Sequence, residues 1–285
     1  MDPETTLAAT KSWPLYPDTT NNEPLASSFT IQSQSGHPVV TSVKRPWLFH
    51  YSPSPSTTQQ PSRAVLILGG GGYTSLMIGR EGLAVAKWLT SLGFHAFILV
   101  HRFPTADSGA SAPVDDARRA LELITEKMKG FGIGAVGLSS GGHLAASLLA
   151  TYPKSWKQEV HTPKLDFAII GYAPISTNAK GRTIIPNKPA LEPKEKQELY
   201  DAVQPDFQLE GPVPPTFIVY SGNDPVVPVV NAYRLAGGVA EAGAQVELHV
   251  FADAPHGFAL DTVGLPVGRW MELCEAWMRQ KGFLG

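Results

Sequence analysis

A serine at position 139 lies in a G-x-S-x-G pattern at residues 137–141, which is typical of a nucleophile on a sharp turn between a strand and a helix. The apolar residues 133–136 before it predict a strand, and residues 142–149 after it predict a helix rich in small residues. The two glycines of the pattern leave no Cβ where strand and helix backbones crowd the turn. We therefore predict that Ser139 is a nucleophile whose hydroxyl is exposed at the end of a sheet.

A serine nucleophile needs a histidine base and an acid that orients the histidine. In G-x-S-x-G enzymes with this strand-turn-helix context, the chain order is serine, then acid, then histidine. Asp224 follows a predicted strand at residues 216–220, and His256 follows another at residues 245–251. Sites gather at the carboxyl ends of parallel strands. We predict that His256 is the base and Asp224 the acid.

Other residues compete for these two roles. His143 lies on the predicted helix directly after the turn, where its ring would point away from the hydroxyl. His249 lies inside a predicted strand, and Asp253 precedes His256 by three residues in a loop that it could cap instead. Three more histidines precede the serine, which is the wrong chain order: His50, His95 and His101.

Four consecutive glycines, residues 69–72, directly follow a predicted buried strand at residues 63–68. Such a run is costly in chain entropy and makes sense where backbone N–H groups must approach a ligand closely. We predict an oxyanion hole for a tetrahedral intermediate, formed by the N–H groups of Gly71, Gly72 and Ser140. The alternative is a phosphate-binding loop. It would need G-x-x-x-x-G-K-[ST], or G-x-G-x-x-G with a downstream acid, and no Lys-Ser/Thr pair follows here.

The elements that must position these residues alternate between strand and helix from residue 63 onward. This alternation predicts an α/β fold with a mostly parallel central sheet and helices on both faces. The other elements expected are strands at 29–31, 46–50, 94–100 and 167–172 and helices at 83–92, 114–129 and 267–279, with a loop at 52–62. Within the helix at 114–129, we expect Asp116 and Arg119 to form a structural ion pair.

We expect one domain over residues 28–285, preceded by a polar N-terminal arm at residues 1–27. Residues 173–215 interrupt the alternation with many prolines and one charged helix candidate at 193–201. Loops of this length in a compact domain are usually functional.

The chain resembles α/β-hydrolases of the esterase group that includes hormone-sensitive-lipase-like enzymes. It is especially similar to acetylxylan-esterase-like and bifunctional feruloyl/acetyl-esterase-like proteins. The resemblance covers most of the chain from about residue 39, and the matching stretches are residues 70–73, 80–82, 85–89, 96–102, 113–120, 137–145, 223–228, 246–251 and 255–258. In two places the chain departs from these relatives. It has Leu68-Gly69 where they often carry a histidine that braces the oxyanion loop, and Ser140 where they usually carry alanine.

The resemblance implies an α/β-hydrolase fold and a serine esterase that works through an acyl-enzyme, with no metal or organic cofactor. It also implies a cap over the site at residues 173–215 and, as substrate, a small ester of a short acyl group such as acetyl. Tyr73, Tyr172 and Phe258 are expected pocket walls. Three alternatives remain open: a biosynthetic tailoring enzyme that uses the same triad for deacetylation, thioester release or condensation; a peptidase or amidase; and a non-catalytic binding protein on the same scaffold.

Composition excludes several other classes of protein. The 285 residues carry a net charge of −2 with scattered Lys and Arg, which argues against nucleic-acid binding. Cys274 is the only cysteine, so neither an intramolecular disulfide nor a cysteine-based metal site is expected. The N-terminus lacks a signal-peptide pattern, and no apolar run has the length of a membrane span. We expect a soluble cytoplasmic protein, and the oligomeric state stays open.

Overall fold

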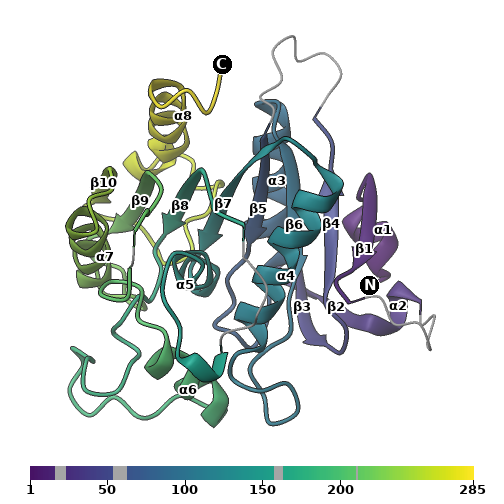
Figure 1. Ribbon diagram of the computed structural model, residues 1–285. Coiled ribbons are helices and arrows are strands. Elements are labelled where there is room, and N and C mark those ends of the chain that lie inside the picture. The colour runs from purple at the N-terminus through teal and green to yellow at the C-terminus, as the bar shows by residue number, and fades with distance from the viewer. Residues whose placement is uncertain (17–23, 54–62, 157–162, 210) are drawn as a thin grey trace.

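The structure is a computed structural model that describes residues 1–16, 24–53, 63–156, 163–209 and 211–285. Its main strands are β1 Lys11–Pro14, β4 Trp47–Tyr51, β5 Arg63–Leu68, β6 His95–Val100, β7 Gly132–Leu138, β8 Phe167–Gly171, β9 Thr216–Ser221 and β10 Val246–Phe251. They form one eight-stranded sheet in the order β1-β4-β6-β5-β7-β8-β9-β10 (Figure 1). Pairing is parallel from β6 to β10 and antiparallel at the edge made by β4 and β1.

The central parallel strands β5, β7 and β8 are almost entirely apolar because both of their faces are covered, whereas the edge strand β10 is only partly buried. In β5, every side chain from residue 64 to residue 68 is fully buried. Successive side chains of a strand point to opposite faces, so such a strand requires a helical layer on each side. The α/β fold predicted from the alternation of elements is therefore confirmed.

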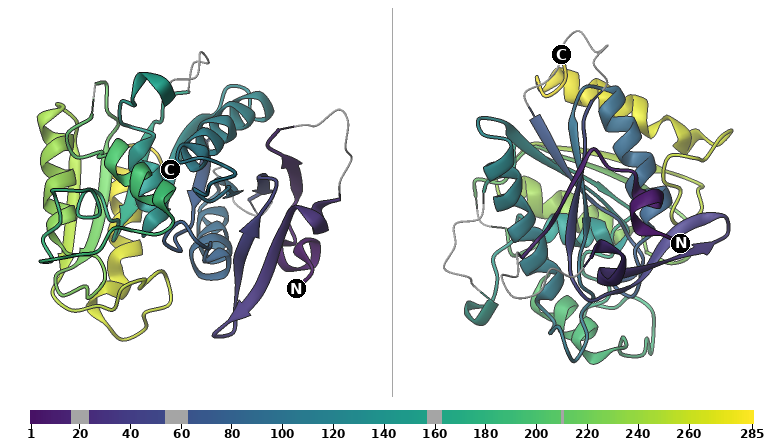
Figure 2. Two further views of the ribbon diagram at one scale, coloured as in Figure 1. Left: turned by 90° about the horizontal axis from the view of Figure 1, so that it is seen from below. Right: turned by 90° about the vertical axis from the view of Figure 1, so that its right-hand side faces the viewer.

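Helices supply these two layers. They are α3 Ala84–Ser91, α4 Ala112–Lys127, α5 Ser140–Ser147, α7 Val230–Glu241 and α8 Trp270–Gln280. A further helix, α6 Lys194–Ala202, lies beyond the ends of the strands (Figure 1), and shorter turns are η1 Ile78–Leu83 (π-helical), η2 Lys154–Trp156 and η3 Pro266–Arg269. On one face α3 meets α8, where the rings of Trp88 and Trp270 pack edge to face at 5.5 Å. On the opposite face α4 contacts α5 (Figure 2).

The N-terminal segment contributes to the sheet. It contains α1 Pro3–Leu7 and α2 Leu25–Ser28, and β2 Phe29–Gln34 pairs with β3 His37–Val43 in a separate two-stranded sheet. Within the predicted arm, β1 pairs with β4, with Ser12 opposite Phe49. The domain boundaries stay predictions, but the arm includes an edge strand. The loop predicted at residues 52–62 lies mostly outside the described residues.

The predicted ion pair between Asp116 and Arg119 is wrong. Asp116 is fully buried and pairs instead with Arg102, at 2.6 Å, just after β6. Arg119 reaches Glu122 and Glu126 on its own helix, at 2.9 and 3.1 Å. The two residues have different partners because Asp116 faces the sheet, where its carboxylate also accepts the backbone N–H of Arg102.

Within the described residues, no helix has the length and apolar character that a membrane span requires.

Candidate active site

Ser139 occupies the turn between the end of β7 and the start of α5. Its backbone has φ 54° and ψ −127°, a conformation that a residue with a Cβ adopts only when its surroundings enforce it. The flanking glycines create those surroundings. A Cβ on Gly137 would lie 2.2 Å from the Gly141 carbonyl oxygen, and one on Gly141 would lie 2.0 Å from the Leu68 carbonyl oxygen. The close approach of backbones expected from the sequence is therefore present.

Three side chains from the carboxyl ends of three parallel strands meet in a hydrogen-bonded line. The Ser139 Oγ lies 3.0 Å from Nε2 of His256, and Nδ1 of His256 lies 2.7 Å from Oδ2 of Asp224. The other Asp224 oxygen accepts the N–H groups of Val226 and Val227, each at 2.8 Å. The Asp224 side chain is fully buried, so its carboxylate has a fixed orientation. With Nδ1–H donating to Asp224, Nε2 is free to accept the serine proton.

The competing candidates have other partners. His143 is fully buried, and its Nε2–H donates to the Val203 carbonyl at 3.0 Å while Nδ1 accepts the Tyr73 hydroxyl at 2.8 Å. Burial lowers the pKa of His143 to about 4, which keeps the ring neutral. Asp253 accepts the side-chain N–H of Asn223 at 2.7 Å. The other histidine candidates contact residues other than Ser139. His249 pairs with Glu247, His50 with His95, and His101 with the Arg102 carbonyl.

The glycine loop after β5 lies against the serine. A Cβ on Gly70 would lie 2.6 Å from the Ser139 Cβ. Of the three predicted oxyanion donors, the N–H of Gly72 is already paired, because it donates to the Ser140 Oγ at 2.9 Å. Across the part of the chain that the structure describes, the N–H groups of Gly71 and Ser140 have no hydrogen-bond partner. These two groups are therefore available to a ligand.

Glu81 braces the glycine loop, and the sequence interpretation gave it no role. Its Oε2 accepts the Gly70 N–H at 2.6 Å and its Oε1 accepts the Tyr172 hydroxyl at 3.0 Å. The Tyr172 hydroxyl in turn accepts the Ala259 N–H at 3.3 Å, in the segment that follows His256. Burial raises the pKa of Glu81. One carboxylate thus ties the glycine loop to the segment that follows the histidine.

The three aromatic residues expected as pocket walls are buried around the site. The Tyr172 ring lies 5.3 Å from the His256 ring and 4.5 Å from the Phe258 ring, edge to face in both cases. Tyr73 packs edge to face on Tyr200 at 5.6 Å. All three are at most 1% exposed. Of the three, only Tyr73 lines the cavity beside the glycine loop, whereas Tyr172 and Phe258 pack behind the His256 segment.

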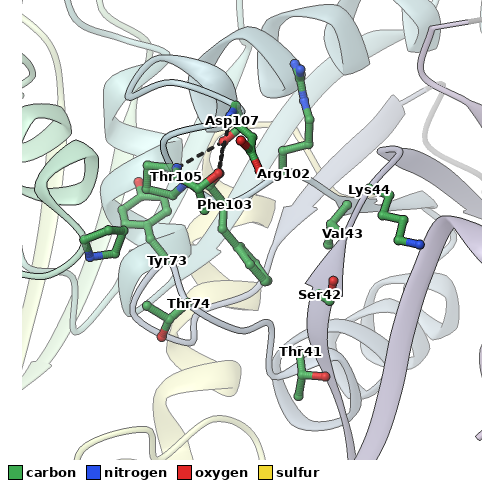
Figure 3. A pocket seen from close by; sticks show the side chains of 13 residues that line it. Thr41, Ser42, Val43, Lys44, Tyr73, Thr74, Arg102, Phe103, Thr105 and Asp107 are labelled. Carbon is green, nitrogen blue, oxygen red and sulfur yellow. Dashed lines mark hydrogen bonds between the residues drawn. The ribbon is translucent and has the colours of Figure 1, made fainter.

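A cavity of about 560 Å³ lies beside the glycine loop, and no residue of the serine-histidine-aspartate line faces it. Figure 3 shows Thr41, Ser42 and Val43 of β3 and the following Lys44 along one wall, with Tyr73 and Thr74 across from them. The loop at residues 102–108 forms the upper wall, and Pro193 closes the cavity next to α6. The Tyr73 hydroxyl is bonded to His143, whereas five lining residues are serines or threonines: Thr41, Ser42, Thr74, Thr105 and Ser108.

Among the described residues, no three His, Cys, Asp or Glu side chains cluster in a way that could hold a metal ion. Cys274 is buried.

Comparison with known proteins gives two family matches. The BD-FAE family model matches residues 51–238, and the dienelactone hydrolase family matches residues 204–285. The acetylxylan esterase of Xylanibacter ruminicola is 26% identical over 219 residues, which cover 72% of this chain and 43% of that protein. The chain therefore spans less than half the length of this curated relative.

Solved structures with the same fold include two esterases. The acetyl ester-xyloside bifunctional hydrolase of Caldicellulosiruptor lactoaceticus has a TM-score of 0.70 and 28% identity, covering 96% of this chain and 97% of that one. A carboxylesterase of Lactobacillus plantarum has a TM-score of 0.69 at 18% identity, covering 90% of this chain and 98% of that one, which supports the fold alone.

Proposed function

This chain belongs to the BD-FAE family, and we propose that it is a serine hydrolase that cleaves a carboxylic ester through an acyl-enzyme. One observation carries the proposal: the continuous hydrogen-bonded line from Ser139 through His256 to Asp224. The strained backbone of Ser139 supports it, because strain of this kind collects at functional sites.

In the proposed mechanism, the Ser139 hydroxyl attacks the ester carbonyl while Nε2 of His256 takes its proton. The imidazolium that forms is stabilised by the buried Asp224 carboxylate. His256 then gives the proton to the leaving alcohol, and an acyl group remains on Ser139. Water repeats the sequence with the acyl-enzyme and releases the acid. The chain's own residues supply every proton transfer in this scheme.

We propose that the oxyanion is held by the free N–H groups of Gly71 and Ser140. Gly72 contributes by donating its N–H to the Ser140 hydroxyl, which fixes the loop against the start of α5. Removal of one oxyanion donor typically costs about 100-fold or more in rate. Glu81 holds the loop from the other side through Gly70.

The substrate proposed is an ester of a short acyl group, such as acetyl. Two similar proteins, one matched by sequence and one by structure, are named for acetyl esters. Residues 173–215, which contain α6, would form the cap of the single domain proposed for residues 28–285. The hydroxyl-lined cavity beside the glycine loop is proposed to hold a part of the substrate away from the scissile bond.

Hydrolysis of p-nitrophenyl acetate, butyrate and octanoate by the wild type and by Ser139→Ala tests this proposal. We expect acetate to be the best substrate and kcat to fall on the order of 10⁴-fold to 10⁶-fold in the variant. A fluorophosphonate should label Ser139 in the wild type, as mapped by mass spectrometry, and circular dichroism should verify that the variant is folded. Labelling without turnover of the three esters would indicate a dedicated substrate. A folded wild type that neither labels nor turns over would contradict the proposal.

A further inference from the structure

Lys196, near the start of α6, places its ammonium group over the glycine loop. A Cβ built on Gly72 would lie 3.8 Å from the Lys196 Nζ and 4.0 Å from the Thr74 Oγ1. The Gly72 N–H donates to the hydroxyl of Ser140, the residue directly after the proposed nucleophile. The ammonium group is therefore next to the loop that would hold the reacting ester.

The packing of α6 fixes this position. Residues four apart lie on the same face of a helix, so Lys196 shares a face with Tyr200. Tyr200 is buried, with its ring 5.6 Å from the Tyr73 ring and 4.6 Å from the His143 ring. Because Tyr73 directly follows Gly72, this contact between rings holds one turn of α6 above the glycine loop.

The ammonium group has no partner of its own. Lys194, two residues earlier, lies 3.8 Å from Glu195, whereas Lys196 makes neither an ion pair nor a side-chain hydrogen bond within the described ranges. Its side chain is partly buried, and burial together with the positive charge of Lys188 lowers the pKa of Lys196. Lys188 donates to the Thr177 carbonyl at 3.3 Å. A partly buried cation beside a second cation gains most from an anionic partner.

The cavity beside the glycine loop extends to the residues around Lys196. Thr74 and Pro193 both line the cavity of about 560 Å³, and Pro193 lies three residues before Lys196 at the start of the same helix. The Thr74 Oγ1 and the Lys196 Nζ both lie within 4.0 Å of the point where a Cβ on Gly72 would stand, so a molecule at the Thr74 side of the cavity comes close to the ammonium group. Thr74, which Figure 3 shows on the wall of the cavity, therefore marks the side of the cavity that lies nearest to Gly72 and the Lys196 ammonium group.

We propose that Lys196 binds an anionic group of the substrate, so that the preferred esters carry a carboxylate or a similar oxyanion close to the scissile bond. This inference rests on the proposed ester hydrolysis. The anion can be part of the acyl group or part of the alcohol, and both chemistries satisfy the same ammonium. A substrate of this kind contributes the missing partner of Lys196 at the moment of binding.

The test compares three esters: 4-nitrophenyl acetate, which is neutral, mono-4-nitrophenyl succinate, which is anionic in the acyl group, and 5-acetoxy-2-nitrobenzoate, which is anionic in the alcohol. The values of kcat/KM are measured for the wild type, Lys196→Gln and Lys194→Gln. In Lys196→Gln we expect kcat/KM for one of the anionic esters to fall about tenfold relative to the neutral ester, mainly through KM. Lys194→Gln, on the same helix with a side chain that is 86% exposed, should leave that ratio unchanged.

A second measurement separates this inference from the proposed hydrolysis. Calorimetric titration of Ser139→Ala with monomethyl succinate and 3-acetoxybenzoate, each against its neutral methyl ester, reports binding without turnover. We expect an anionic compound to bind more tightly than its neutral counterpart, and the added Lys196→Gln change to remove that difference. If wild-type turnover fails but this difference is seen, the inference stands without the hydrolase. Two outcomes would overturn the inference. If Lys196→Gln lowered kcat/KM equally for all three esters, Lys196 would act on the oxyanion or on the fold. If it lowered kcat/KM for none of them, Lys196 would not contact the substrate.

Discussion

The turn that carries Ser139 and the region at residues 173–215 are held in place by different kinds of contact. At the turn, backbone approaches backbone, and a Cβ on Gly141 would lie 2.0 Å from the Leu68 carbonyl oxygen. In residues 173–215, hydrogen bonds from side chains hold the backbone in place. Asn231 on α7 accepts the N–H groups of Ser176 and Thr177, at 3.0 and 3.2 Å. The difference indicates that the turn tolerates almost no substitution, whereas the second region can change its surface and keep its path.

Other side chains repeat this pattern in the second region. Arg182 pairs with Asp206 at 2.6 Å, and Gln197 accepts the Leu191 N–H at 2.9 Å. Each of these contacts holds one stretch of backbone in residues 173–215, and the exposed side chains beside it can be substituted without breaking the contact. A substrate-selective residue such as Lys196 fits this background, because its helix is held by contacts that do not involve its ammonium group.

The largest expected effect contrasts a glycine of the turn with a glycine of the second region. Gly141→Ala should prevent folding or lower the free energy of unfolding by more than about 4 kcal/mol, because backbone crowds the new methyl group. Gly181→Ala is the matched control. Gly181 has φ +74° but open space around it, so the substitution should cost only about 1 kcal/mol. Urea denaturation of both variants gives the comparison, and equal losses would remove the distinction between the two regions.

Sequence patterns predicted the turn better than its surroundings for a physical reason. Glycine spacing and apolar runs report local sterics and burial, so the bounds of β5 and the position of the turn followed from the residues themselves. The helix α7 was not predicted, and neither was the edge strand β1, whose sequence Lys-Ser-Trp-Pro has no alternating pattern. Ion pairs between residues that are distant in the sequence cannot be predicted from local residue patterns. Asp116 was matched to its helical neighbour because its actual partner, Arg102, lies 14 residues away in the chain.

A second expected effect concerns Glu81, which joins the glycine loop to the segment after His256. Glu81→Ala leaves the Gly70 N–H and the Tyr172 hydroxyl without their acceptor, which should cost about 3 kcal/mol of unfolding free energy. Looser positioning of the loop should also lower kcat about tenfold, since the oxyanion donors lose their alignment. Thermal or urea denaturation and ester hydrolysis report the two effects separately.

Glu81→Gln serves as the conservative control, because its amide oxygen can still accept the Gly70 N–H. It should retain most of the stability and most of kcat at neutral pH. Burial raises the pKa of Glu81, so the folded protein keeps this proton to higher pH than the unfolded chain does. Wild-type stability should therefore fall as pH rises above the ordinary glutamate value of 4.5, and Glu81→Gln should lack that part of the fall. A glutamine variant as damaged as the alanine variant would contradict the bracing role.

The smallest expected effect concerns His143, which follows the Ser139 turn and hydrogen-bonds to Val203 in residues 173–215. Its Nδ1 accepts the Tyr73 hydroxyl and its Nε2–H donates to the Val203 carbonyl just after α6, and the first of these bonds requires a neutral ring. Burial lowers the pKa of His143 from 6.5 to about 4, so the unfolded chain takes up this proton first as pH falls. Stability should therefore be complete above pH 6.5 and should decline by about 2 kcal/mol on going to pH 5.

His143→Phe isolates that contribution. Phenylalanine fills the site without a titrating group, so the variant should be less stable at pH 7.5 but should lose less stability between pH 7.5 and pH 5. His50, whose pKa burial also lowers to about 4, remains in the variant and accounts for a residual acid dependence. Urea denaturation at the two pH values measures both. If the variant declines as steeply as the wild type, the acid-dependent loss of stability does not come from the neutral His143 ring and its bond with Tyr73.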